Sequence, residues 1–194
     1  MVLRIVPNAL TAGTVLCGTV LIVSPALAPL EPATVVSILL LALTLDVLDG
    51  AAARVLSVKN PVGGNFDQLA DLTCFGIAPA IYFIGQRLRG AGQLGSAKLD
   101  SAGEWPGQLQ IDALVAFFYV LCSVYRIARE LVVHSGKRPL HFVGIPTNLA
   151  ALLFVPATAY APEHALLPAY GLVLSCFMVS WFHIPKGLWI VTVR

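Results

Sequence analysis

Three long stretches of this sequence contain no charged residue, and they limit what kind of structure the chain can form. They cover residues 5–30, 139–162 and 164–185. A helix needs about 20 mostly apolar residues to cross the hydrocarbon core of a membrane. Over the whole chain 58% of residues are hydrophobic and 11% are charged, whereas a soluble domain has about 25% charged residues. The sequence therefore predicts an integral membrane protein. The net charge of +2 is too small for a nucleic-acid groove, so no nucleic acid is expected as a partner.

Shorter apolar runs lie between the long ones, and they reach spanning length once a few charged residues are included. They cover residues 32–45, 72–86 and 113–125. Prolines and glycines stand at or beside the expected helix ends, as is typical of such ends. The pattern predicts an all-α, multi-pass protein with one domain over residues 1–194. Six transmembrane helices are expected, at residues 8–27, 33–56, 67–88, 111–133, 145–161 and 165–184.

Basic side chains are unevenly distributed between the two ends of these helices. Six crossings place both termini on the same side as the loops near residues 57–66 and 134–144. That side carries nine of the twelve lysines and arginines. Because cytoplasmic loops carry an excess of basic residues, both termini and the helix ends beside them are expected in the cytoplasm.

Four of the ten acidic residues gather in one short stretch inside the predicted helices: Asp46, Asp49, Asp67 and Asp71. An ionisable side chain at membrane depth is costly and marks a functional site by default. Asp46 and Asp49 are three residues apart, and Asp67 and Asp71 are four apart, so each pair shares a helix face. A break at residues 60–64 turns the chain back, so the four carboxylates are expected to converge at the cytoplasmic end of two antiparallel helices.

The carboxylates could belong to a structural ion-pair network or could bind metal. Only Arg54 and Lys59 are close in sequence, which leaves an excess of negative charge for a divalent cation to neutralise. Oxygen-only ligation suits Mg²⁺ or Mn²⁺, and two ions could share bridging carboxylates. Gly50 and Ala53 leave the same helix face without bulk, so a phosphate could approach closely. Arg54 could hold that phosphate with its planar guanidinium group.

Residues 46–71 read D-V-L-D-G-A-A-A-R-V-L-S-V-K-N-P-V-G-G-N-F-D-Q-L-A-D. This stretch resembles the signature of the CDP-alcohol phosphatidyltransferase family, D-x-x-D-G-x-x-A-R-x8-G-x-x-x-D-x-x-x-D, at every fixed position. Residues 7–11 are also similar to the P-N-x-x-T opening of that family's first helix.

Three further segments are similar to the phosphatidylserine synthases of the same family. They are residues 67–80, 125–129 and 142–147. Glu130 is a departure, because these synthases usually carry an aromatic residue there, beside the region expected to hold the acceptor alcohol.

The resemblance implies a membrane enzyme of phospholipid biosynthesis. Such an enzyme transfers the phosphatidyl group of CDP-diacylglycerol to an alcohol and releases CMP. The sequences of these motifs favour L-serine as the acceptor, and inositol, glycerol phosphate and choline are the alternative acceptors. The implied partners are CDP-diacylglycerol, a small alcohol, membrane lipid and a second copy of the chain in a homodimer.

The resemblance also implies a role for particular residues. The ligands of two Mg²⁺ or Mn²⁺ ions would be Asp46, Asp49, Asp67 and Asp71. Asp71 would also act as the general base. The residues that bind the CDP-lipid would be Asn8, Thr11, Gly50, Arg54 and Asn60.

Arg126 and Arg129 lie three residues apart near the cytoplasmic end of the fourth predicted helix. They could be ordinary basic residues that flank a membrane helix. Alternatively, one of them binds a phosphate or the carboxylate of the acceptor, for which an arginine fork is well suited.

Two other functions fit part of the pattern. A membrane prenyltransferase also binds a diphosphate through aspartates and Mg²⁺, but it lacks the D-G-x-x-A-R motif. A cation channel or transporter would explain buried carboxylates, but not the glycine and arginine that frame them.

Overall fold

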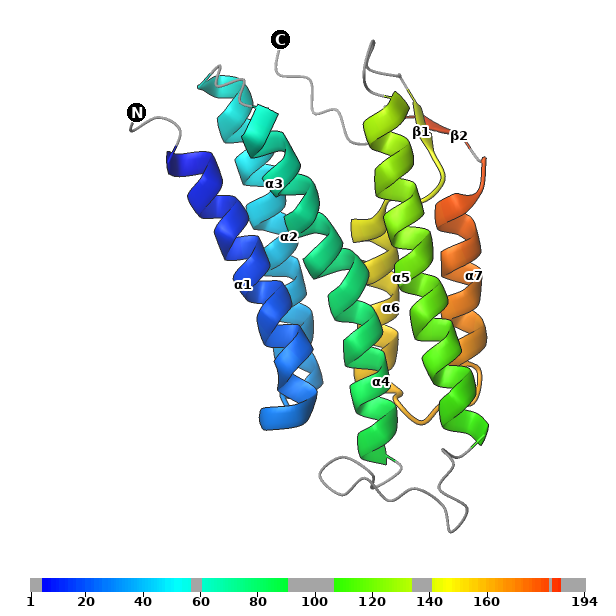
Figure 1. The fold of residues 1–194 in the computed structure, drawn as a ribbon. Coiled ribbons are helices and arrows are strands. Elements are labelled where there is room, and N and C mark those ends of the chain that lie inside the picture. Colours follow the sequence, from blue (N-terminus) through cyan, green and yellow to red (C-terminus); the bar gives the residue numbers. More distant parts are fainter. Residues whose placement is uncertain (1–4, 57–60, 91–106, 134–140, 182, 186–194) are drawn as a thin grey trace.

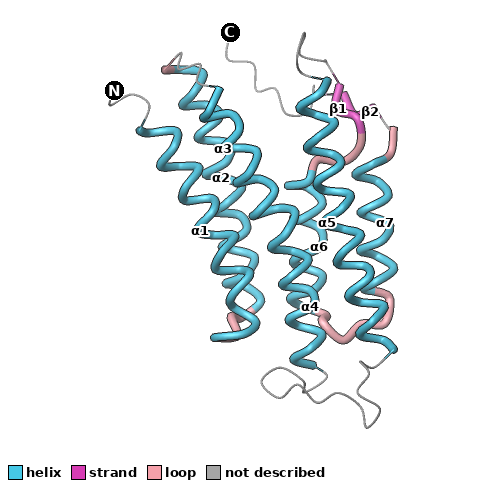
Figure 2. Tube along the Cα trace, viewed as in Figure 1, coloured by secondary structure: helices cyan, strands magenta, loops and turns pink. Residues whose placement is uncertain are grey.

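The structure, a computed structural model, describes residues 5–56, 61–90, 107–133, 141–181 and 183–185 of the 194-residue chain. Its helices run up and down beside one another, and a small two-stranded sheet lies at one end of the bundle (Figure 1 and Figure 2). In chain order the elements are α1 (Ile5–Leu27), α2 (Pro32–Val55), α3 (Pro61–Asp71), the π-helix η2 (Leu72–Ile77), α4 (Ala78–Gly90), α5 (Gly107–Val133), β1 (His141–Val143), α6 (Thr147–Tyr160), α7 (Leu167–Val179) and β2 (His183–Pro185).

The predicted all-α class is confirmed, with the short sheet as an addition. Each of the six predicted helices corresponds to one helical rod, and α3, η2 and α4 together form the third. This rod begins at Pro61 rather than at residue 67, so most of the predicted break is helical. Proline is well tolerated in a first helical turn. The last predicted helix was wrong at its end, because α7 stops at Val179 and residues 183–185 form β2.

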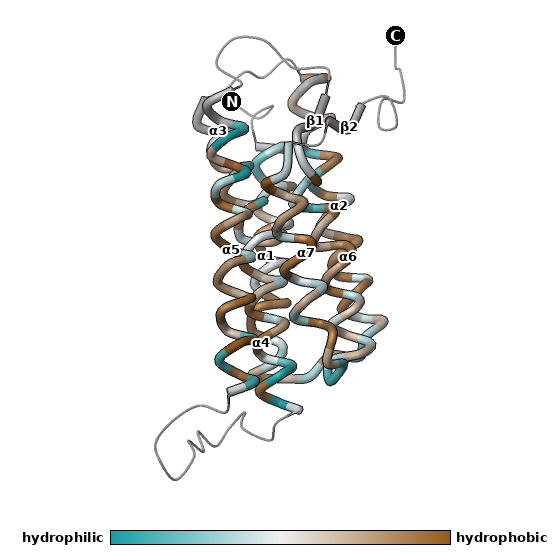
Figure 3. Tube along the Cα trace, turned by 90° about the vertical axis from the view of Figure 1, so that its right-hand side faces the viewer, coloured by the Kyte–Doolittle hydropathy of each residue, from teal (hydrophilic) through white to brown (hydrophobic). Residues whose placement is uncertain are grey.

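Among the residues that the structure describes, four helical segments are long and apolar enough to cross a membrane: Val6–Leu27, Pro32–Ala53, Phe66–Gly90 and Gly107–Glu130. Hydrophobic residues fill the middle of the bundle, and hydrophilic ones collect toward its ends (Figure 3). Helices α6 and α7 are also apolar, but their 14 and 13 residues reach only about 21 and 20 Å at ~1.5 Å per residue. A hydrocarbon core is about 30 Å thick. The prediction of an integral membrane protein is therefore supported by four of the six rods.

Two clusters of buried side chains hold the bundle together, and α4 and α6 contribute to both. The first cluster joins α1, α2, η2, α4 and α6, and the second joins α4, α5, α6 and α7. In the second cluster the Phe154 ring of α6 lies 5.2 Å from the ring of Tyr119 and 5.3 Å from that of Phe83. These aromatic contacts fix α6 at the centre of the bundle.

Helix α1 lies unusually close to the π-helix that follows Asp71. A Cβ atom on Gly18 would stand 2.8 Å from the Cα of Cys74, so only glycine allows this approach. On the other side of the π-helix, the Tyr119 hydroxyl donates a hydrogen bond to the Phe75 carbonyl oxygen at 3.3 Å. Short π-segments occur frequently at functional sites. Here the π-helix is held from both sides, which fixes the end of α3 that carries Asp71.

The sheet closes the α6–α7 hairpin at its base. Strand β1 precedes α6 and β2 follows α7, and the two pair antiparallel with Phe142 opposite Ile184. Immediately after β1, Gly144 adopts φ 79°, and a Cβ there would stand 2.5 Å from the Met178 carbonyl oxygen. The glycine therefore lets the chain cross the end of α7 before α6 begins.

Candidate active site

The four aspartates singled out in the sequence come from α2 and α3, and the structure brings them together. Carboxylate oxygens of Asp46, Asp49 and Asp67 lie within 4.8 Å of one another. The Asp46 side chain also contacts the carboxyl group of Asp71. Helix α1 packs against both α2 and α3, the two helices that carry these aspartates. The predicted convergence is therefore present in the fold.

This carboxylate cluster fits a divalent cation. Its donors are all oxygens, as Mg²⁺ and Mn²⁺ prefer. Oδ1 of Asp71 is buried without a hydrogen-bond partner among the described residues. The ion pairs between described side chains, Arg87–Asp112 and Arg126–Glu130, include none of the four aspartates. Within the described residues, a structural ion-pair network therefore does not account for the cluster.

Two polar residues outside α2 and α3 hold carboxylates of the cluster in place. The Thr11 hydroxyl of α1 donates a hydrogen bond to Oδ2 of Asp49 at 2.7 Å, and both side chains are buried. The Asn148 side chain of α6 contacts Asp46. Hydrogen bonds of this kind orient the ligands of a metal site and tune its affinity.

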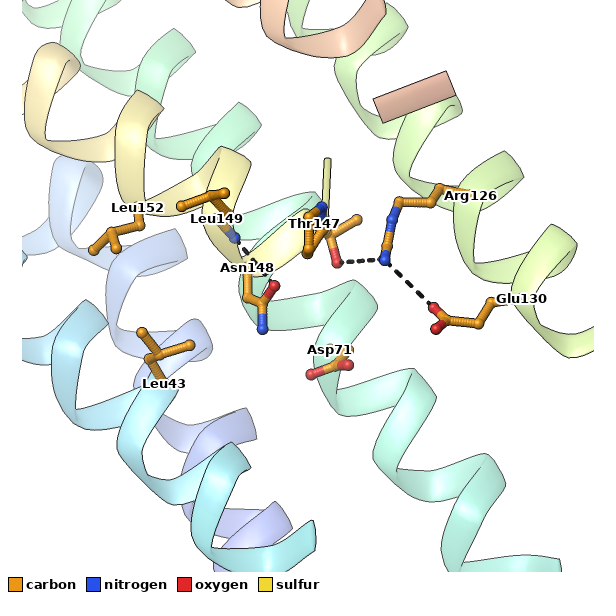
Figure 4. Close-up of a pocket in the computed structure, with 9 residues that line it drawn as sticks. Leu43, Asp71, Arg126, Glu130, Thr147, Asn148, Leu149 and Leu152 are labelled. Atoms are coloured by element: carbon orange, nitrogen blue, oxygen red, sulfur yellow. Dashed lines mark hydrogen bonds and ion pairs between the residues drawn. The ribbon is translucent and has the colours of Figure 1, made fainter. Parts of the chain in front are cut away.

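A cavity of about 230 Å³ lies beside the carboxylates, and Asp71 forms part of its wall (Figure 4). Its lining comes from α2, α3, α5 and the start of α6: Leu43, Asp71, Arg126, Glu130, Pro146, Thr147, Asn148, Leu149 and Leu152. One side of the cavity is apolar, and charged groups stand on the other. The cavity is large enough for a small polar molecule next to Asp71.

The structure separates the two arginines that the sequence could not distinguish. Arg126 is buried, lines the cavity, and donates to the Thr147 hydroxyl at 3.4 Å (Figure 4). Arg129 instead donates to the Val179 carbonyl oxygen at 3.2 Å and lies 6.0 Å from the centre of the Tyr125 ring. Arg129 thus ties α5 to the end of α7, whereas Arg126 faces the cavity.

Comparison with known families matches residues 4–189 to the CDP-alcohol phosphatidyltransferases. The chain belongs to the CDP-alcohol phosphatidyltransferase family. The match covers nearly all of the sequence, including the signature at residues 46–71.

Several curated relatives carry the name CDP-diacylglycerol–serine O-phosphatidyltransferase, and three of them illustrate the similarity. The protein from Mycobacterium tuberculosis is 28% identical over 158 residues, which are 79% of this chain and 48% of the relative. The Bacillus subtilis protein is 28% identical over 181 residues, 93% of this chain and 89% of its own length. The Helicobacter pylori protein is 31% identical over 116 residues, 58% of this chain and 40% of the relative. The chain thus spans about half the length of the mycobacterial relatives.

The structure describes the surroundings of only some of the residues expected to bind a CDP-lipid. A Cβ atom on Gly50 would meet nothing within 4 Å, so this part of α2 borders open space. Asn8 is exposed near the start of α1, and the Thr11 hydroxyl is engaged by Asp49. Arg54 lies in the last turn of α2, but its side chain is outside the described set, as is the whole of Asn60.

Sequence reasoning gave no role to Thr147 and Asn148, which the structure places in the cavity wall. A signal was present, because these two polar residues follow Pro146 within an otherwise apolar run. Proline is typical at the start of a helix. Two polar side chains at such a start, at membrane depth, could have marked a helix that begins beside a site.

Proposed function

We propose that this protein transfers the phosphatidyl group of CDP-diacylglycerol to L-serine and releases CMP. One observation carries the proposal: Asp71 belongs both to the carboxylate cluster and to the wall of the cavity that Arg126 enters. A diphosphate held at the cluster and an alcohol held in the cavity would therefore meet at Asp71. The family and the names of the relatives support the same reaction.

In this reaction the serine hydroxyl oxygen forms a bond to the phosphorus that carries the diacylglycerol. The bond between that phosphorus and the oxygen leading to CMP breaks, and CMP leaves with the electron pair. The hydroxyl proton passes to the Asp71 carboxylate. Oδ1 of Asp71 is buried and has no partner among the described residues, which suits an acceptor for that proton.

Two Mg²⁺ or Mn²⁺ ions would be held by Asp46, Asp49, Asp67 and Asp71. When bound, they supply positive charge at the diphosphate. Thr11 keeps Asp49 in its orientation and Asn148 does the same for Asp46.

The CDP-lipid would lie along α2 where Gly50 leaves open space. Arg54 and Asn60 would hold its phosphates, and Asn8 would approach the nucleotide from α1. Thr11 would contribute through Asp49 rather than by direct contact, because its hydroxyl is already engaged. The acyl chains would remain among the lipids between the helices.

The chain would act as one membrane domain over residues 1–194, with all six helical rods across the bilayer. The end of the bundle where α2 ends, α3 begins and the sheet lies would face the cytoplasm, because nine of the twelve lysines and arginines belong, by sequence, to the segments expected on that side. The carboxylate cluster lies toward that end, where the cytidine diphosphate headgroup of the lipid and serine from the aqueous phase would both be accessible. We also propose a homodimer, on the resemblance to the family.

The test is an assay of the purified full-length chain in detergent or vesicles with CDP-diacylglycerol, Mn²⁺ and labelled serine. The expected products are CMP and labelled phosphatidylserine in equal amounts. Release of CMP with inositol, glycerol phosphate or choline in preference to serine would refute the acceptor and keep the chemistry. No CMP release with any alcohol would refute the enzyme and favour cation transport.

A further inference from the structure

The cavity beside Asp71 carries charges of both signs, and Glu130 supplies a negative one. Glu130 lies one turn after Arg126 on α5, and both residues line the cavity. Its Oε2 stands 3.5 Å from an Nη of Arg126 (Figure 4). The Glu130 side chain is 37% exposed, whereas that of Arg126 is 8% exposed. Arg126 therefore lies deep in the wall and Glu130 nearer the opening.

Arg126 has hydrogen-bonding capacity left for a ligand. Its Nε is buried without a partner among the described residues. Its contacts to Thr147 and Glu130 are long, at 3.4 and 3.5 Å. Strong charge-assisted bonds are about 2.7–2.9 Å long. A carboxylate could therefore take two parallel donors of this guanidinium.

The start of α6 adds positive potential to the same wall. Pro146 caps the helix without a side-chain hydrogen bond, and Thr147, Asn148 and Leu149 form its first turn. The backbone N–H groups of a first turn have no backbone partner within the helix, and they attract anions. The Leu149 N–H already donates to Oδ1 of Asn148 at 3.1 Å, so this potential comes from the N–H groups of Thr147 and Asn148. Together with the buried, incompletely bonded Arg126, they make one region of the cavity suited to a carboxylate.

Glu130 and Arg126 together would match a ligand that carries both charges. We propose that Glu130 binds the ammonium group of the acceptor while Arg126 and the start of α6 bind its carboxylate. The inference rests on the proposed function and adds a specificity residue to it. A zwitterionic ligand would replace the long Arg126–Glu130 contact with two shorter ones, so that the buried Arg126 charge keeps a partner. A cavity of about 230 Å³ admits a small amino acid.

The experiment compares serine with 3-hydroxypropanoate, which keeps the hydroxyl and the carboxylate but lacks the ammonium group. CMP release is measured for both acceptors with the wild type and with Glu130→Gln. We expect the wild type to prefer serine. In Glu130→Gln the ratio of the two kcat/KM values should fall by about 10- to 100-fold, the range for a lost bond between charged groups. The KM for CDP-diacylglycerol should not change.

Two further variants separate recognition from structure. Glu130→Asp keeps the carboxylate and should retain a preference for serine. Glu163→Gln removes the same charge from a different cavity, which Arg87 and Asp112 line, and should leave the ratio unchanged. An unaltered ratio in Glu130→Gln overturns the proposal, as does an equal loss for both acceptors, because Glu130 would then act only through Arg126. A wild type that releases no CMP with serine refutes the proposed function instead, and this inference with it.

Discussion

Removal of the Thr11 hydroxyl tests whether the carboxylate cluster binds metal, without changing any of its carboxylates. The Thr11–Asp49 hydrogen bond is 2.7 Å long, and both residues are only 4% exposed. Thr11→Val keeps the shape of the side chain and deletes the donor. A hydrogen bond to a charged group contributes about 1.5–3 kcal/mol. At about 1.4 kcal/mol per factor of ten, its loss corresponds to about 10- to 100-fold.

If Asp49 is a metal ligand, this loss appears as weaker metal binding. We expect the Mn²⁺ concentration for half-maximal CMP release to rise about 10- to 100-fold in Thr11→Val, as for other residues that orient metal ligands. Turnover at saturating Mn²⁺ should return close to the wild-type value. Thr11→Ser keeps the hydroxyl, so its CMP release should depend on the Mn²⁺ concentration nearly as in the wild type.

Thr14→Val provides the matched control. Thr14 lies one turn later on α1 and is also buried, but among the described residues its hydroxyl bonds only the Leu10 carbonyl oxygen of its own helix, at 3.4 Å. The Mn²⁺ concentration for half-maximal CMP release should be the same in Thr14→Val as in the wild type. An unchanged midpoint in Thr11→Val, or the same shift in Thr14→Val, would show that the Thr11–Asp49 bond does not support a metal site.

Four other changes probe the proposed roles one at a time. Asp67→Asn, or EDTA with the wild type, should abolish CMP release, and full activity in EDTA would rule out the two-metal proposal. Asp71→Asn should lower kcat by about 10²- to 10⁴-fold, the usual contribution of a general base, with a smaller effect on CDP-diacylglycerol binding. Gly50→Ala places a methyl group in open space, so the melting temperature should not change while the KM for CDP-diacylglycerol rises. Gly107→Ala, whose methyl group would also meet no neighbour within 4 Å, should change neither the melting temperature nor this KM. Arg126→Lys should raise the KM for serine about tenfold, because lysine cannot offer two parallel donors; an equal rise in the KM for CDP-diacylglycerol would contradict this.

The helices and the pairing of the aspartates could be predicted because both depend on local periodicity. Apolar runs of spanning length define a membrane helix whatever packs against it. Spacings of three and four residues put Asp46 beside Asp49, and Asp67 beside Asp71, on their helices. The convergence of the two pairs followed from the chain reversal between α2 and α3, and it is present although that reversal is shorter than predicted.

The features that the sequence did not reveal depend on contacts between distant segments. The π-helix after Asp71 is held by Gly18 and Tyr119, which lie on other helices. The β1–β2 pairing joins residues some forty positions apart, one strand in a predicted loop and the other at the end of the last predicted helix. The different directions of Arg126 and Arg129 result from what α6 and α7 offer to each, namely the Thr147 hydroxyl and the Val179 carbonyl oxygen.

The short length of α6 has a physical reason that also concerns the cavity. The uncharged run at residues 139–162 is long enough to span, yet α6 begins only at Thr147, because Gly144 turns the chain with a positive φ and Pro146 follows. Its first turn therefore lies beside the cavity at the level of Asp71. First-turn N–H groups in a lipid environment are unfavourable unless they face a cavity or a ligand. A helix that filled the whole run would direct these groups away from Asp71 and leave Arg126 as the main positive charge in the wall. The same shortening that leaves α6 too short to cross the hydrocarbon core thus places its first turn at the end of the cavity proposed to bind the acceptor carboxylate.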